Sequence, residues 1–320
     1  MPIIDLPLEQ LKVYKPPLTR RRDFLQFWTE NIKLSREQPL NLRTSKVDYP
    51  VNKLEAFSLT FDGFWDKTPI SAWLLKPAID GALPAFLFFH GYGGNKGSIS
   101  DYLGWVLQGY VVMAVDVRGQ SGDSPDFARY PSGSVMGNMT KGILDRSKYY
   151  YRYVYMDCLR ALEILLERSD VRKDRVGITG VSQGGGLTLA VSALDKRVAL
   201  SLPEVPYLCH FERAIEVATQ GPYLEILDFM KRHREEVEKI EETLSYFDAM
   251  NFAPEIKCPT MMSVGLVDTV CPASTIFAVF NHMLSERREL SIYPGMGHES
   301  LNVHHEKKIK WATEYLIGQR

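Results

Sequence analysis

A serine at a predicted strand-to-helix turn is the residue of this chain that most clearly points to chemistry. Ser182 lies at the centre of the sequence GVSQG, residues 180–184. Residues 176–179 (VGIT) predict a short buried strand, and residues 185–190 (GGLTLA) predict the start of a helix. At such a turn the serine hydroxyl stands above the sheet edge, and small residues two positions away let strand and helix approach closely. The pattern therefore predicts a nucleophilic serine with the free amides of a helix N-terminus beside it.

Two further residues stand where a serine nucleophile needs a base and an acid. Asp268 follows a predicted strand that ends at Val264, and His298 follows a predicted strand that ends at Tyr293. The order Ser, Asp, His, with each residue just past the C-terminal end of a strand, is that of α/β-hydrolases. A serine hydroxyl is a weak nucleophile at neutral pH, so His298 would accept its proton and Asp268 would fix the imidazole tautomer.

Other acids and imidazoles compete for these two roles and fit them less well. Asp116 follows a strand that comes too early in the chain, and Asp123 and Asp248 lack a preceding strand at the right position. His304 and His305 fall inside or at the start of the predicted closing helix. We therefore keep Asp268 and His298 as the predicted partners of the serine.

A glycine-rich loop, HGYGGNKG (residues 90–97), directly follows the apolar strand AFLFF (residues 85–89). A phosphate cradle is one alternative, but Lys96 stands where a dinucleotide fingerprint has its last glycine, and no G-K-[ST] occurs. A simple tight turn is the other alternative. In a hydrolase such a loop supplies the second amide of an oxyanion hole. We therefore predict that the amides of Tyr92 and Gln183 stabilise an oxyanion and that His90 shapes the loop.

The elements that must position these residues alternate between strands and helices. Alternation at 57–61 and 70–75 predicts an antiparallel pair that opens the sheet. Continuous apolar runs such as 85–89 and 111–115 are typical of interior parallel strands covered on both faces. We predict a single α/β-hydrolase domain over residues 1–320, with a mostly parallel central sheet flanked by helices. It carries an N-terminal extension of about residues 1–50 and a cap-like helical insertion of about 209–250, between the strands near 198–203 and 260–264.

Composition excludes several classes of partner. The chain has 320 residues, 45% hydrophobic and 24% charged, with a formal net charge of −1. A near-neutral surface would draw neither nucleic acid nor an anionic membrane, and no run approaches the ~20 apolar residues that span a bilayer. We expect no secretion signal and no metal-like cysteine spacing, and therefore a cytoplasmic protein with reduced thiols. The four cysteines are Cys158, Cys209, Cys258 and Cys271.

Several segments together resemble the seventh carbohydrate esterase family. Its three signatures are matched by RGQ (118–120), GVSQGGG (180–186) and HE (298–299), and the likeness extends over nearly the whole chain. Members are acetyl xylan esterases that also act as cephalosporin C deacetylases. The resemblance implies a triad and an oxyanion hole at the same residues that the pattern indicated, and no metal or cofactor. Those residues are Ser182, Asp268, His298, Tyr92 and Gln183.

The resemblance also implies a substrate and an assembly. The substrate would be a small acetylated saccharide such as a xylo-oligosaccharide, or another small acetyl ester including cephalosporin C. The assembly would be a homo-hexamer, a trimer of dimers whose active sites face an interior cavity, in the cytoplasm. Our hypothesis for Arg118 and Glu299 is that they brace the active-site loops, and a pair between the two side chains is one way in which they could do so.

Two other functions remain open at this stage. A serine peptidase of the prolyl-oligopeptidase type would share the triad and the strand-to-helix turn that carries the serine, which we call the elbow. Such enzymes, however, usually carry a large extra domain. A non-catalytic binding protein could share the fold, but binding alone gives no reason to keep all three catalytic groups. An enzyme of the dienelactone-hydrolase type fits less well, because its nucleophile is commonly cysteine.

Overall fold

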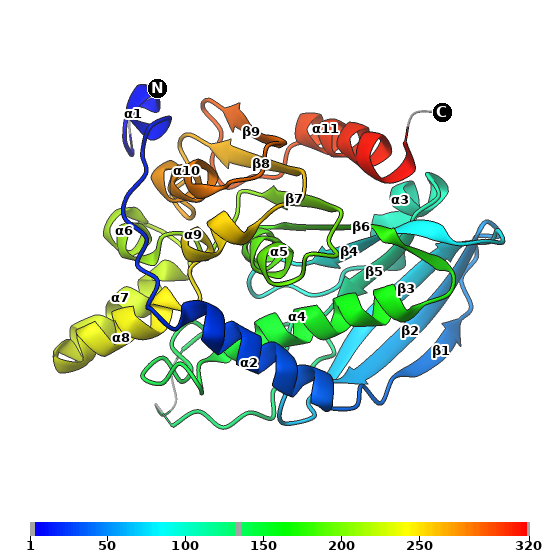
Figure 1. The fold of residues 1–320 in the computed structure, drawn as a ribbon, viewed down its shortest axis with the longest axis horizontal. Helices are drawn as coiled ribbons and strands as arrows, with labels where there is room; N and C mark the ends of the chain where they lie inside the picture. The colour runs from blue at the N-terminus through cyan, green and yellow to red at the C-terminus, as the bar shows by residue number, and fades with distance from the viewer. Residues whose placement is uncertain (1–3, 132, 134–135, 319–320) are drawn as a thin grey trace.

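One nine-stranded sheet runs through the protein (Figure 1). The computed structural model describes residues 4–131, 133 and 136–318. The strand order is β1-β2-β3-β5-β4-β6-β7-β8-β9. The pairs from β1 to β5 are antiparallel, and every pair from β5 to β9 is parallel. The predicted α/β fold with a mostly parallel sheet is confirmed. The strands are β1 (Arg43–Val47), β2 (Leu54–Asp62), β3 (Pro69–Pro77), β4 (Leu83–Phe89), β5 (Val111–Val115), β6 (Val171–Val181), β7 (Leu200–Glu204), β8 (Thr260–Gly265) and β9 (Arg288–Tyr293).

Helices cover both faces of this sheet, as the apolar strands require. On β4, Phe86 and Leu87 belong to two different buried clusters, and Val112 and Met113 on β5 divide in the same way. Successive strand residues point to opposite faces, so these strands are apolar on both sides. The main helices are α2 (Phe24–Glu37), α3 (Leu103–Leu107), α4 (Tyr150–Glu167), α5 (Gln183–Leu194), α9 (Ala249–Phe252), α10 (Ala273–His282) and α11 (Asn302–Ala312). None of the helices in the described ranges combines the length and apolar character needed to cross a bilayer.

The N-terminal segment packs against the rest of the domain and adds a strand that the sequence pattern did not indicate. Helix α2 packs on α4, and Trp28 is buried, with its indole N–H donating to the carbonyl of Tyr246 at 2.9 Å. Strand β1 was not anticipated. Its sequence RTSKV is mostly exposed at the sheet edge, so it lacks the apolar alternation that marks a strand.

Three more helices lie between β7 and β8, where the helical insertion was expected. They are α6 (Phe211–Val217), α7 (Tyr223–Arg232) and α8 (Val237–Ser245). Both α7 and α8 pack against α6, and Figure 1 shows them at one end of the molecule, away from the sheet. We refer to residues 209–250 as the cap. The described residues of the segment 121–148 form no helix or strand.

The close approach of α5 to the central strands requires glycine at its first turn. A Cβ atom on Gly184 would lie 2.1 Å from the carbonyl oxygen of Phe89 on β4. A Cβ atom on Gly180, at the end of β6, would lie 2.5 Å from the same oxygen. Both approaches are to backbone atoms, which cannot move aside as a side chain can. The spacing of the two glycines therefore sets how tightly helix and strand meet.

Replacing Gly184 by alanine should lower the free energy of unfolding by about 3 kcal/mol, because the methyl group overlaps the backbone of β4. The matched control is Gly104→Ala in α3, since a Cβ there meets no heavy atom of the described chain within 4 Å. In a helix that exchange should be neutral or stabilise by up to about 1 kcal/mol. Denaturant unfolding of both variants measures the difference, and equal stability would contradict this account of the turn.

Candidate active site

Ser182 occupies a strained backbone conformation between β6 and α5. Its φ is 57° and its ψ is −117°, in a region that residues other than glycine rarely adopt. Its N–H donates to the carbonyl of Glu204 at 2.9 Å, and its own carbonyl accepts from Tyr207 at 2.9 Å and from Gly186 at 3.0 Å. The neighbouring strand, the following segment and the helix thus all hold the turn in place.

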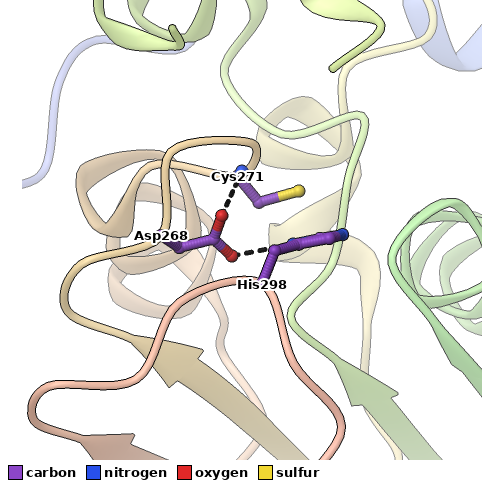
Figure 2. A group of neighbouring side chains, drawn as sticks. All are labelled: Asp268, Cys271 and His298. Atoms are coloured by element: carbon purple, nitrogen blue, oxygen red, sulfur yellow. Dashed lines mark hydrogen bonds and ion pairs between the residues drawn. The ribbon is translucent and has the colours of Figure 1, made fainter. Parts of the chain in front are cut away.

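The structure brings the three predicted catalytic residues into one hydrogen-bonded line. His298 Nε2 lies 2.9 Å from Ser182 Oγ, and His298 Nδ1 lies 2.8 Å from Asp268 Oδ2. Figure 2 shows the contact between Asp268 and His298. An ionised carboxylate only accepts hydrogen bonds, so Nδ1 carries the proton and Nε2 offers a lone pair to the serine hydroxyl.

Asp268 is itself held in orientation. The residue is 1% exposed, and its Oδ1 accepts from the amides of Val270 and Cys271, both at 2.8 Å. The second of these bonds appears in Figure 2. With one oxygen bound by backbone amides, the other oxygen is aimed at the imidazole.

The loop that carries His298 is anchored by a buried carboxylate that the sequence pattern did not single out. Glu204, the last residue of β7, accepts from the Ser300 hydroxyl at 2.7 Å and forms an ion pair with Lys308 of α11. Glu204 and Lys308 are both buried. Burial alone would raise the pKa of this carboxyl, but the Lys308 ammonium and the Ser300 hydroxyl hold it below the usual value. The only sequence signal was a carboxylate directly after an apolar strand.

Both predicted oxyanion donors lie beside the elbow. Gln183 is the first residue of α5, so its amide has no intrahelical acceptor. The loop bearing Tyr92 lies against the same turn. A Cβ atom placed on the neighbouring Gly91 would lie 3.9 Å from the Cβ of Ser182. Gln120 joins the two sides: its Oε1 accepts from the Gly93 amide at 2.7 Å, and its Nε2 donates to Gln183 Oε1 at 2.8 Å.

His90 and Lys96 form contacts that hold this loop in place. His90 Nδ1 lies 2.7 Å from the Gly91 carbonyl, and His90 Nε2 accepts from the Val117 amide at 2.9 Å. Burial lowers the pKa of His90, so the neutral ring shapes the loop as predicted. Lys96 is buried against Asp116 at 2.6 Å, which leaves it no role as a phosphate ligand.

Two other residues that could have served as the catalytic acid or base have partners elsewhere in the fold. Asp248 accepts from the amide of Met250 and caps α9, and burial raises the pKa of its carboxyl to about 6. His304 faces the Tyr293 hydroxyl at 3.1 Å, and burial lowers the pKa of His304 to about 4. Neither group contacts Ser182 among the hydrogen bonds of the described chain.

Among the described residues, one group could offer ligands to a metal ion, and it overlaps the triad. One ligand atom from each of Asp268, Cys271 and His298 falls within 4.8 Å of the others (Figure 2). Two of these residues are already bonded to each other, and burial raises the pKa of the Cys271 thiol well above its usual value, which disfavours the thiolate that binds metals. A cation here would also take Nε2 away from Ser182. The donor set therefore fits proton transfer better than metal binding.

The hypothesis that Arg118 pairs with Glu299 is wrong. Arg118 is fully buried and binds Asp157 of α4 through Nε at 2.7 Å and Nη2 at 3.0 Å, and its Nη1 lies 2.8 Å from Asp66. Glu299 is exposed. Because Arg118 follows β5, its side chain reaches inward to α4 and to the β2–β3 turn and not toward the His298 loop. Its main-chain carbonyl still supports the site by accepting from the hydroxyl of Tyr150.

Arg118→Met should lower the free energy of unfolding by about 3–5 kcal/mol, because it leaves the buried carboxylate of Asp157 without its charged partner and with only the Phe64 amide as a hydrogen-bond donor among the described residues. Glu299→Gln is the control and should change stability by less than about 0.5 kcal/mol, as exposed substitutions usually do. Urea or thermal unfolding tests both. If the two variants lost similar stability, the original pairing hypothesis would be restored.

Asp268→Asn should reduce kcat for p-nitrophenyl acetate by about 10⁴, because the amide would donate to Nδ1 and place the imidazole proton on Nε2, facing the serine. Asp123→Asn is the control, because the Asp123 carboxylate is exposed and pairs with Lys96 among the described residues. It should keep its activity. A D268N enzyme with more than about a tenth of the original kcat would refute the assigned role.

Comparisons with known proteins identify the family of this chain. The family model of acetyl xylan esterase (AXE1) matches residues 1–315. An acetyl xylan esterase from Paenibacillus sp. R4 has 43% identity and a TM-score of 0.94, with 97% of this chain and 100% of that chain covered. Acetyl xylan esterase 1 from Thermoanaerobacterium sp. JW/SL YS485 has 32% identity and a TM-score of 0.93, with 97% and 99% covered.

A curated relative extends the comparison to a longer protein. Acetyl esterase Axe7A of Xylanibacter ruminicola is 27% identical over 312 residues, which are 95% of this chain and 69% of that protein. The family model matches nearly the whole chain, and the two solved structures superpose closely on 97% of it. The chain belongs to the acetyl xylan esterase family and is a carboxylic ester hydrolase.

Proposed function

We propose that this protein removes O-acetyl groups from acetylated xylo-oligosaccharides and from small acetyl esters including cephalosporin C. The family assignment supports hydrolysis of acetyl esters. The observation that carries the mechanism is the hydrogen-bonded line from Ser182 through His298 to Asp268. Neither a metal ion nor a cofactor has a step in this reaction.

The first half of the reaction transfers the acetyl group to the enzyme. Ser182 Oγ attacks the ester carbonyl carbon while its proton passes to His298 Nε2. The carbonyl oxygen becomes an oxyanion that accepts from the amides of Tyr92 and Gln183. When the carbon–oxygen bond of the ester breaks, the imidazolium donates its proton to the departing sugar oxygen. The sugar leaves as an alcohol, and an acetyl-serine remains on the enzyme.

The second half regenerates the serine. Water enters beside the acetyl-serine, and His298 Nε2 accepts a proton from it as its oxygen attacks the carbonyl. The same two amides stabilise the second oxyanion. The bond to Ser182 Oγ then breaks, and the proton held by His298 returns to that oxygen, so acetate is released and the enzyme is restored. Throughout, the Asp268 carboxylate stabilises the imidazolium without itself taking up a proton.

We further propose that the enzyme acts in the cytoplasm as a homo-hexamer, a trimer of dimers with its active sites facing an interior cavity. The support is the resemblance of the sequence to a carbohydrate esterase family. Such an assembly would admit short saccharides and exclude polymeric xylan. Light scattering of the purified protein tests the assembly, and the ratio of acetate released from oligosaccharide and from polymer tests the exclusion.

The enzyme should prefer acetyl over longer acyl groups. In a pocket shaped for a methyl group a longer chain would have to displace packed side chains, so kcat/KM for p-nitrophenyl octanoate should be roughly a hundredfold below that for the acetate. Acetate release from acetylated xylo-oligosaccharide and from cephalosporin C tests the two proposed classes of substrate. Ser182→Ala is the control, and it should abolish turnover without unfolding the protein.

Three outcomes would contradict this proposal. Efficient hydrolysis of the octanoate would remove the acetyl preference. Faster cleavage of a peptide p-nitroanilide than of the acetyl ester would favour the peptidase alternative. If a serine-directed phosphonate failed to label Ser182, the binding-protein alternative would be restored.

A further inference from the structure

The cap sends a carboxylate to one of the two oxyanion residues. The hydroxyl of Tyr92 donates to both carboxylate oxygens of Glu225, at 2.9 Å to Oε1 and 3.0 Å to Oε2. Glu225 lies in the first turn of α7, whereas Tyr92 lies 133 residues earlier in the chain, in the loop after β4. The loop that supplies an oxyanion amide is thus fastened by its own side chain to the cap.

A third segment closes this contact. The amide of Met139 donates to Glu225 Oε2 at 3.0 Å, and the amide of Asn138 donates to the Tyr92 hydroxyl oxygen. Gly137 precedes them with a φ of +78°, and a Cβ atom on it would lie 2.1 Å from Glu225 Oε2. The chain therefore passes close against the carboxylate, in a backbone conformation that favours glycine.

The charges at this contact are arranged to keep it intact. Burial raises the pKa of the Tyr92 phenol. The phenol therefore keeps its proton and remains a donor. Burial also raises the pKa of the Glu225 carboxyl, but hydrogen bonds from the Met139 amide and the Tyr92 hydroxyl oppose that rise because they favour the carboxylate. The two groups that face the carboxylate, an O–H and a backbone N–H, are both donors, and a carboxylate offers them two accepting oxygens, whereas an amide offers one and places an N–H₂ donor in the other position.

The same segment reaches the second oxyanion residue. The Tyr151 hydroxyl lies 3.3 Å from Met139 Sδ and donates to Gln183 Oε1 at 2.9 Å. Both residues whose amides face the oxyanion are therefore tied by their side chains to the short stretch 138–139. A shift of that stretch, or of α7, would move the Tyr92 loop relative to Ser182, whereas the Gln183 amide is fixed by its place at the start of α5.

We propose that Glu225 is a positioning residue that holds the Tyr92 loop so that its amide meets the developing oxyanion. This inference rests on the proposed ester hydrolysis and adds to it a residue that touches neither substrate nor triad. Because the carboxylate acts through Tyr92, it should affect the transition state, where the oxyanion forms, and leave ground-state binding of the ester nearly unchanged.

Glu225→Gln and Tyr92→Phe test this directly with p-nitrophenyl acetate. Each variant keeps the Tyr92 amide but weakens or removes its anchor, and we expect kcat to fall about tenfold while KM stays within about twofold. The double variant should lose no more than about the larger single loss, because both changes remove one interaction. Glu212→Gln is the matched control: Glu212 is an exposed glutamate on cap helix α6, and its loss should leave kcat unchanged.

A second readout separates positioning from general structure. A boronic acid that forms a tetrahedral adduct with Ser182 should bind the Glu225→Gln enzyme about tenfold more weakly, in proportion to the loss in kcat. Thermal unfolding of each variant gives the folded fraction. The inference is overturned if Glu225→Gln keeps kcat within twofold, or if its lost activity equals the unfolded fraction, or if the boronate binds both enzymes equally. If the unchanged enzyme failed to hydrolyse acetyl esters at all, the proposed function would fail, which is a different result.

Discussion

The strained backbone of Ser182 is the constraint on which the rest of the site depends. A residue other than glycine at positive φ costs about 1–3 kcal/mol and persists only where its surroundings determine it completely. Here β6 is paired on both sides, by β4 and by β7, and the carbonyl of Glu204 on β7 accepts the serine amide. Because the glycines at 180 and 184 let α5 begin directly against β4, the hydroxyl and the first free amide of the helix leave the sheet together.

Sheet topology explains how residues 116 positions apart meet at this turn. The parallel strands β6, β8 and β9 all end at one edge, but β7 separates the serine strand from the other two. The buried carboxylate at the end of β7 fills that interval by holding Ser300, two residues past the catalytic histidine, and Lys308. A buried ion pair adds little net stability compared with apolar packing. Its position under the histidine loop indicates that it contributes orientation.

The local sequence pattern predicted the interior strands and the catalytic residues. It did not predict contacts between segments that are distant in the chain. Apolar runs predicted the interior strands, and the order of Ser182, Asp268 and His298 predicted a triad that the structure brings together. The pattern missed β1, whose residues are polar because the edge of the sheet is exposed. It also misassigned the partner of Arg118, since Asp157 lies inside an apolar helix and no spacing rule links it to the end of β5. Side-chain pairing across a fold depends on three-dimensional register, which a single sequence does not encode in its periodicity.

The entry to the cap shows why the cap and the nucleophile behave as one unit. Between β7 and α6, three residues other than glycine have positive φ: Val205, Leu208 and His210. This stretch is bound from three directions, since Tyr207 donates to the Ser182 carbonyl, Val205 donates to the Ser263 hydroxyl, and the Asp248 carboxylate accepts from the His210 amide. Because these hydrogen bonds hold the strained residues, their backbone cannot relax without moving the turn at Ser182. Helix α7, which begins thirteen residues after His210, is therefore placed relative to Ser182 by backbone contacts, and a side chain on it can hold an oxyanion loop with the precision that catalysis needs.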